Sequence, residues 1–172
     1  MGQGDIDWDR FVTDHAERVL RIALRIVGRL DDAEEVSQEV FQECFQVAAA
    51  QGMRDPTGLA VRLATVRSLD RLRRRKARPA DGAELRDSDR VTAISPVEEA
   101  EAKELTDWLR DAVARLPSRQ AEVFALMALE QASREEVATL LGISPDAVST
   151  ALCKARKEIG AALDRRSGGP MR

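Results

Sequence analysis

Six cationic side chains are concentrated in the eight residues from Arg71 to Arg78. Guanidinium and ammonium groups at this density can neutralise phosphates, and each neutralised phosphate releases counterions and adds affinity at low salt. Cations are also favoured near the C-terminus of a helix, so a solvated helix end is the alternative interpretation. Because six cations exceed what helix capping requires, the run predicts a phosphate-binding element.

The segment 133–157 has the spacing of a helix-turn-helix motif. Gly142 can take a positive φ at the corner between two short helices, and Ser144 followed by Pro145 supplies the cap and first residue of the second helix. In this motif the second helix enters the major groove of DNA; a helical hairpin that serves packing alone is the alternative. The predicted DNA-facing set is Ser144, Asp146, Ala147, Ser149, Thr150, Lys154, Arg156 and Lys157.

Carboxylates gather on a different segment, between residues 31 and 43. Together with Gln38 they could bind a basic helix of a partner protein, whereas the alternative is an ordinary solvated surface. One element of the chain therefore suits an anionic ligand and another suits a cationic partner.

Whole-chain properties exclude several classes of protein. The net charge of −3 and the pI near 5.4 argue on average against nucleic-acid binding, although the local basic run outweighs that average. The longest apolar run, 123–129, is far shorter than the roughly 20 residues of a membrane-spanning helix. The acidic N-terminal segment does not resemble a signal peptide, so we expect a cytoplasmic protein without membrane insertion.

The residue types that most enzymes and metal sites need are scarce. Two cysteines and a single histidine cannot form a disulfide framework or a four-ligand zinc site. The chain also has no glycine-rich phosphate loop and no set of serine, histidine and aspartate for nucleophilic catalysis. We therefore expect no enzyme activity, no metal and no cofactor.

Helices must position these groups, because apolar residues recur at steps of three and four along most of the chain. Capping residues and prolines predict helices over 8–27, from Asp31 or Asp32 as cap, and after Asp55 as cap. Further helices are predicted from Pro96, from Ser118 as cap through 129, from Ser133 as cap with Glu136, and from Pro145.

The predicted fold class is all-α, with two small helical domains joined by a flexible linker. Residues 79–95 lack periodicity and are rich in proline, glycine, aspartate and serine, as is typical of a segment that cannot bury a core. The predicted organisation is an N-terminal helical domain over 1–78, an acidic linker over 79–95, a helix-turn-helix domain over 96–166 and a disordered tail over 167–172.

Two stretches of the sequence, DAEEVSQEVF at residues 32–41 and DRLRRR at residues 70–75, form a pattern known from one protein family. They are similar to the region-two motif, and to the ending of that region, in the extracytoplasmic-function group of bacterial RNA polymerase sigma factors, which the sequence therefore resembles. Residues 116–157 are similar to region four. The two motifs occur in the family's order, and the resemblance covers about residues 8–76 and 98–163.

The resemblance implies a promoter-specificity subunit with core RNA polymerase and promoter DNA as partners. It implies that the acidic helix contacts polymerase, that the third helix holds the start-proximal promoter element, and that the last helix reads the upstream element. It also implies an anti-sigma factor as an inhibitory partner, since members of this group are often regulated in that way. The implied polymerase-binding residues are Asp32, Glu34, Glu35, Gln38 and Glu39, and the N-terminal DNA-binding residues are Arg62, Arg67, Arg71, Arg73, Arg74, Arg75 and Lys76.

The third helix departs from the family pattern, because residues 59–66, LAVRLATV, lack its aromatic residues and asparagine. One stack of a base on an aromatic ring contributes ~1–3 kcal/mol, so strand separation should be weaker. Two alternatives therefore stay open. One is a helix-turn-helix regulator that binds duplex DNA without polymerase, and the other is a sigma-like interaction module with reduced DNA affinity.

Overall fold

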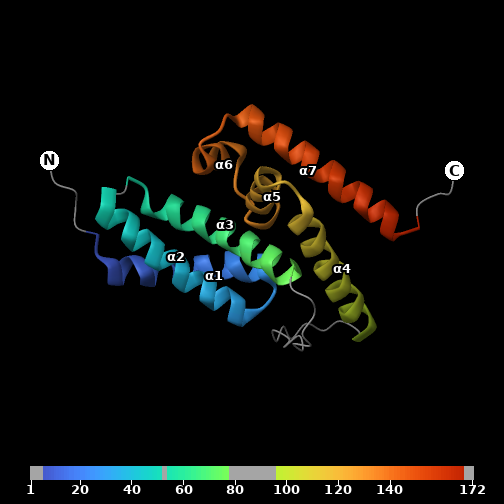
Figure 1. The fold of residues 1–172 in the computed structure, drawn as a ribbon, viewed down its shortest axis with the longest axis horizontal. Coiled ribbons are helices and arrows are strands. Elements are labelled where there is room, and N and C mark those ends of the chain that lie inside the picture. The colour runs from blue at the N-terminus through green and yellow to red at the C-terminus, as the bar shows by residue number, and fades with distance from the viewer. Residues whose placement is uncertain (1–5, 52–53, 78–95, 169–172) are drawn as a thin grey trace. The chain divides into compact units, whose positions relative to one another are not determined.

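The computed structural model describes residues 6–51, 54–77 and 96–168. The chain divides into two units, residues 1–85 and 86–172, and every regular element in the described ranges is a helix (Figure 1). The predicted all-α class is therefore confirmed. The predicted linker over 79–95 lies outside the described residues, as do residues 169–172 of the predicted tail. None of the helices described is both long and apolar enough to cross a membrane.

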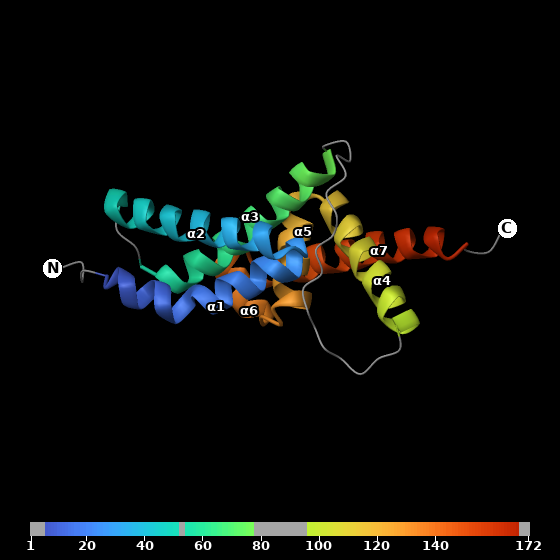
Figure 2. The same ribbon diagram turned by 90° about the horizontal axis from the view of Figure 1, so that it is seen from below.

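The N-terminal unit is a bundle of three helices, each packed against the other two (Figure 2). These helices are α1 (Trp8–Val27), α2 (Leu30–Gln51) and α3 (Pro56–Ala77). Their apolar stripes meet in a core whose fully buried side chains include Ile22, Val36, Val40, Leu69 and Leu72. Burial of these faces, rather than local propensity, stabilises the helices.

The helix ends of this unit follow local chemistry except at the start of α2. Gly28 ends α1 with a φ of 75°, and the Oδ1 atom of Asp55 accepts a hydrogen bond from Gly58 N at 2.8 Å before α3. The prediction of Asp31 or Asp32 as the cap of α2 was wrong, because the helix already begins at Leu30. Both carboxylates lie in its first turn, where a negative charge interacts favourably with the helix dipole.

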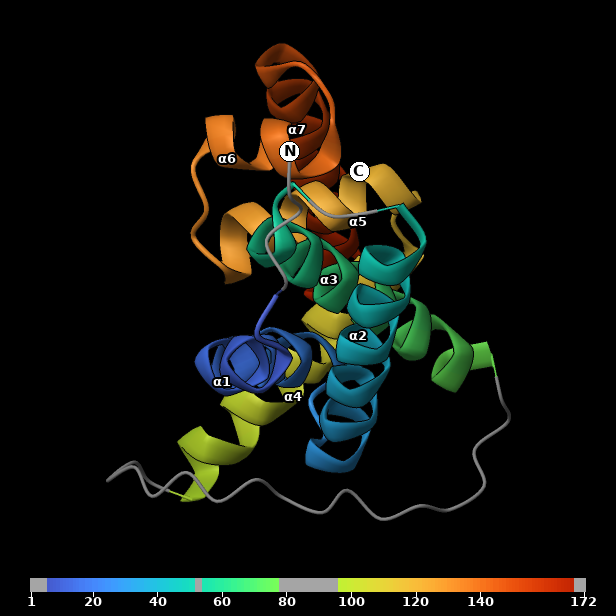
Figure 3. The same cartoon turned by 90° about the vertical axis from the view of Figure 1, so that its left-hand side faces the viewer.

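The described part of the C-terminal unit, residues 96–168, contains five helical segments. They are α4 (Pro96–Arg115), α5 (Ser118–Phe124), the π-helix η1 (Ala125–Leu129), α6 (Arg134–Leu141) and α7 (Pro145–Arg166). Its core includes the fully buried Val123, Leu126, Val137 and Val148, and α7 packs against α4, α5 and α6. Figure 3 shows α6 and the start of α7 side by side.

Two expectations about the start of this unit were wrong in detail. Ser118 is the first residue of α5 rather than its cap, and no side chain caps this helix. The segment predicted as one helix over 118–129 changes from α to π geometry at Ala125. It is followed by Gln131, whose φ of 55° is unusual for a residue with a side chain.

The C-terminal end of α7 is held against α4 by one arginine. The Nη2 atom of Arg166 donates to Glu104 Oε1 at 2.5 Å, and its guanidinium lies 5.7 Å from the centroid of the Trp108 ring. This contact packs the Trp108 ring of α4 against the end of α7.

Candidate partner-docking and nucleic-acid interfaces

The acidic helix α2 presents most of its predicted partner-binding side chains to solvent. Glu34, Glu35, Gln38 and Glu39 are exposed, whereas Asp32 is half-buried. The opposite side of α2 carries the buried Ala33, Val36 and Val40. An exposed acidic face on a helix anchored by its apolar face is a geometry that can receive a basic helix.

The basic run at the end of α3 divides into two faces rather than forming one cationic surface. Arg71 and Arg75, one turn apart, point toward the start of α2. Arg71 forms ion pairs with Asp32, Nε to Oδ1 at 3.5 Å, and with Glu35. Arg75 Nη1 donates to Asp32 Oδ2 at 3.1 Å and to the backbone oxygen of Val27 at 3.0 Å.

A third arginine of the predicted DNA-binding set is also paired with α2. The Nε and Nη2 atoms of Arg67 donate to Glu43 Oε2 at 2.9 and 2.6 Å. This hydrogen-bonded carboxylate raises the pKa of Arg67 above its ordinary value. The structure thus brings Arg67, Arg71 and Arg75 together with acidic residues of the same unit.

The remaining members of the N-terminal DNA-binding set face outward to different degrees. Arg62, Arg74 and Lys76 are exposed. Arg73 is half-buried, and its Nη1 atom lies 3.6 Å from Asp70 Oδ1. Of the predicted N-terminal DNA-binding set, the exposed Arg62, Arg74 and Lys76 are placed best for contact with an external phosphate.

An aromatic cluster links the start of α1 to the second half of α2. The Trp8 ring lies edge-on to Phe11 at 5.6 Å and to Phe45 at 5.3 Å, measured between centroids. Phe45 is nevertheless 54% exposed, so this ring covers the cluster at the surface rather than in the core. Within the same cluster His15 packs against Phe11 and its Nε2 atom lies 3.2 Å from Thr57 Oγ1, which agrees with a packing role.

In the C-terminal unit α6, Gly142 and α7 form the predicted helix-turn-helix motif. Ser133 and Glu136 complete a capping box at the start of α6, and Gly142 adopts the left-handed conformation with a φ of 63°. Ser144 Oγ accepts a hydrogen bond from Ala147 N at 3.1 Å and so caps α7. The corner therefore forms by the local chemistry that the sequence predicts.

All eight residues of the predicted DNA-facing set are exposed, seven of them on α7 and Ser144 at its N-cap. The opposite side of the helix, with Val148, Leu152 and Ala155, is buried against the unit. Cys153 is exposed next to Lys154. The assignment of these side chains to DNA contact stays a prediction.

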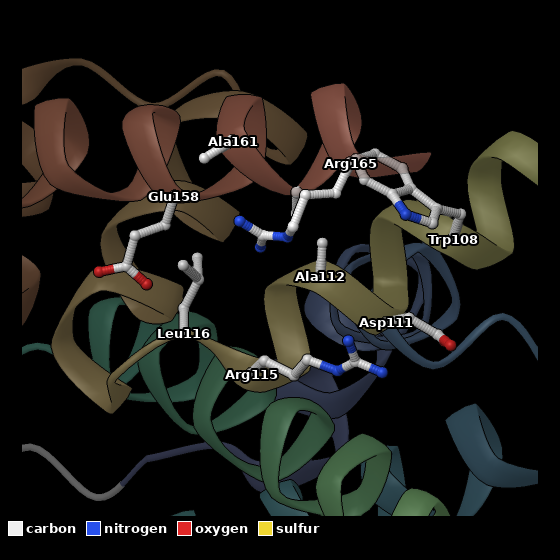
Figure 4. A pocket seen from close by; sticks show the side chains of 9 residues that line it. Trp108, Asp111, Ala112, Arg115, Leu116, Glu158, Ala161 and Arg165 are labelled. Atoms are coloured by element: carbon white, nitrogen blue, oxygen red, sulfur yellow. The ribbon is translucent and has the colours of Figure 1, made fainter. Parts of the chain in front are cut away.

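A cavity of about 250 Å³ lies between α4 and α7, and none of its lining residues belongs to a predicted site. Figure 4 shows Arg115 and Arg165 at this cavity together with Asp111 and Glu158, so its charged groups are balanced. No cluster of three or more potential metal ligands occurs in the ranges that the structure describes.

The two cysteines should differ in reactivity, because Cys44 is fully buried and Cys153 is exposed.

Burial raises the pKa of the Cys44 thiol to about 11. When folding raises the pKa of a group, its contribution to stability is fully present at pH values below the pKa of that group in the unfolded chain. The contribution is lost as the pH rises from that pKa to the pKa in the folded chain. We expect the free energy of unfolding of the N-terminal unit to fall by up to about 2 kcal/mol between pH 9 and pH 11.

The check is chemical denaturation across this pH range, with Cys44→Ala as the matched control. The alanine variant should lose the part of the pH dependence that Cys44 contributes. Identical pH profiles for the two chains would contradict the buried thiol as its source.

Comparison with known proteins places these two units in one family. Residues 11–78 match Sigma-70 region 2, and residues 106–159 match Sigma-70, region 4. The chain belongs to the sigma-70 family. Its region 2 match covers α1 to α3, and its region 4 match covers the helix-turn-helix motif.

Among known proteins, this sigma-70 family chain is similar to the ECF RNA polymerase sigma factor SigE of Mycolicibacterium smegmatis. The two are 32% identical over 164 residues, which cover 93% of this chain and 63% of the relative's length. The resemblance to the extracytoplasmic-function group is thereby confirmed. The fold is similar to that of CnrH, solved in complex with the cytosolic domain of CnrY, with a TM-score of 0.59 and 19% identity over 92% of this chain and 88% of that one.

Proposed function

We propose that this chain is a sigma factor that binds core RNA polymerase and directs promoter-specific initiation of transcription. The observation that carries the proposal is the presence of regions 2 and 4 in order, each with an exposed face of suitable chemistry. The acidic face of α2 would bind polymerase through Glu34, Gln38 and Glu39. Promoter DNA would be held by exposed cations of α3 and by the start of α7.

The role requires binding and no catalysis by this chain, and it places the protein in the cytoplasm with the polymerase. The predicted division into a region 2 domain over 1–78 and a region 4 domain over 96–166 is part of this proposal. So is inhibition by an anti-sigma factor, which the resemblance to the family implies. CnrH, which has a similar fold, was solved in complex with the cytosolic domain of another protein, CnrY.

The test is capture of purified core RNA polymerase by the full chain, followed by run-off transcription on fragmented genomic DNA. We expect the chain to bind polymerase and to produce discrete transcripts that core polymerase alone does not make. Binding without new transcripts would favour the interaction module with reduced DNA affinity. Absence of polymerase binding would favour the stand-alone DNA-binding regulator.

A further inference from the structure

We infer that Arg71 and Arg75 are positioning residues that hold the polymerase-docking helix in place, with Asp32 as their anchor, and that these three residues do not themselves contact polymerase or DNA. The inference rests on the proposed function. It reassigns one residue of the predicted polymerase set and two of the predicted DNA set.

The carboxylate of Asp32 is already shared between the two arginines. Its Oδ1 atom lies 3.5 Å from Arg71 Nε, and its Oδ2 atom accepts from Arg75 Nη1 at 3.1 Å. The side chain of Asp32 is only 22% exposed, against 62% for that of Glu35. A polymerase side chain would have to displace a guanidinium from Asp32 in order to bind it.

The two arginines are directed inward in the same way. The Nε and Nη2 atoms of Arg71 are both buried, with Asp32 and Glu35 as their ion-pair partners. The Nη1 atom of Arg75 donates hydrogen bonds to Asp32 and to the backbone oxygen of Val27. Phosphate binding by either arginine would break these contacts and leave the half-buried carboxylate of Asp32 with only one of its two counter-charges.

The contact with Val27 gives this network its positioning effect. Val27 is the last residue of α1, where backbone carbonyls lack partners within the helix and a cation is favoured. Through Arg75, the end of α1, the first turn of α2 and the end of α3 meet at one point. The network therefore sets the direction in which α2 leaves the turn at Gly28, and with it the orientation of Glu34, Gln38 and Glu39.

A double-mutant cycle on polymerase affinity tests the inference, using the full chain with Arg75→Ala, Asp32→Ala and both together. Loss of a charge-assisted hydrogen bond corresponds to about a tenfold loss of affinity. Asp32 also pairs with Arg71, and Arg75 also binds the backbone oxygen of Val27. Because the contact between Asp32 and Arg75 is lost in both single variants, we expect each of them to lose about tenfold and the double variant to lose clearly less than the product of the two losses. A roughly hundredfold loss in the double variant would show independent contacts and overturn the inference.

The salt dependence of promoter binding by the assembled holoenzyme provides the second readout. A phosphate contact to single-stranded DNA contributes about 0.7 to the slope of log affinity against log salt. We expect Arg75→Ala to leave this slope unchanged, whereas Arg74→Ala, the exposed neighbour, should lower it. A drop of about 0.7 in the Arg75→Ala variant would establish Arg75 as a phosphate contact and overturn the assignment.

Two controls separate positioning from general loss of structure. Arg21→Ala removes an arginine from an exposed i,i+4 pair with Glu17 on α1 and should leave polymerase affinity unchanged. Arg75→Lys keeps the positive charge but not the forked guanidinium donor, so it should recover part of the polymerase affinity that Arg75→Ala loses. A lysine variant that melts at the native temperature but recovers no affinity would count against the contact. If the wild-type chain does not bind polymerase, the proposed function is wrong. If the wild-type chain binds but the losses of the two single variants add up in the double variant, only the inference about positioning is wrong.

Discussion

A chain carrying Gln38→Ala and Glu39→Lys is expected to lose capture of core RNA polymerase by about a hundredfold or more. Both side chains are exposed on α2 and lie outside the network of Asp32, Arg71 and Arg75. Reversing one charge opposite a basic partner helix replaces attraction with repulsion, which costs about 3 kcal/mol or more. The measurement is a titration of polymerase at fixed ionic strength with labelled chain.

Glu17→Lys is the matched control, because the Glu17 side chain is 92% exposed on α1 and belongs to no predicted site. It introduces the same change of charge and should bind polymerase as the wild-type chain does. Equal affinity of the α2 variant and this control would remove α2 from the docking surface.

The second large effect is expected from Val148→Asp, which should unfold the C-terminal unit. Val148 is fully buried on the inner side of α7, next to the turn of the helix-turn-helix motif. An unpaired carboxylate buried there costs several kcal/mol, against a total stability of about 4–12 kcal/mol for a unit of this size. Backbone NMR signals of residues 96–168 should collapse, while those of α1 to α3 keep their dispersion.

Ala161→Asp provides the comparison for this substitution, since Ala161 lies on the same helix but is exposed. It should retain the native signals of both units. Loss of the α1 to α3 signals in Val148→Asp would contradict the division of the chain into separately folded units.

The features that the sequence predicted correctly are those determined by neighbouring residues. The bounds of α1 follow from its apolar period and from Gly28, and the capping box at Ser133 and the corner at Gly142 need only residues a few positions apart. The start of α2 was misplaced because α1 ends so sharply at Gly28 that the next helix begins at Leu30, ahead of its acidic residues.

The features that the sequence did not reveal depend on contacts between distant segments. Asp32 and Arg75 are separated by 43 positions, and no local pattern indicates which carboxylate an arginine will meet. The sequence of residues 71–78 suggests a single cationic surface. The buried Leu72 shows, however, that this helix has an inner side, and Arg71 and Arg75 lie next to it. The π-helix at Ala125 and the exposure of Phe45 likewise result from packing rather than from residue type.

The pairing within the N-terminal unit also affects how fast the chain can find a basic partner. Of the acidic residues of α2, Asp32, Glu35 and Glu43 carry an arginine as counter-ion, so much of the formal negative charge is cancelled at short range. Long-range attraction of a positively charged surface then depends mainly on Asp31, Glu34 and Glu39. The association rate should consequently depend on ionic strength as expected for a helix with about three effective charges. Electrostatic attraction will therefore accelerate the encounter less than the acidic composition of α2 suggests.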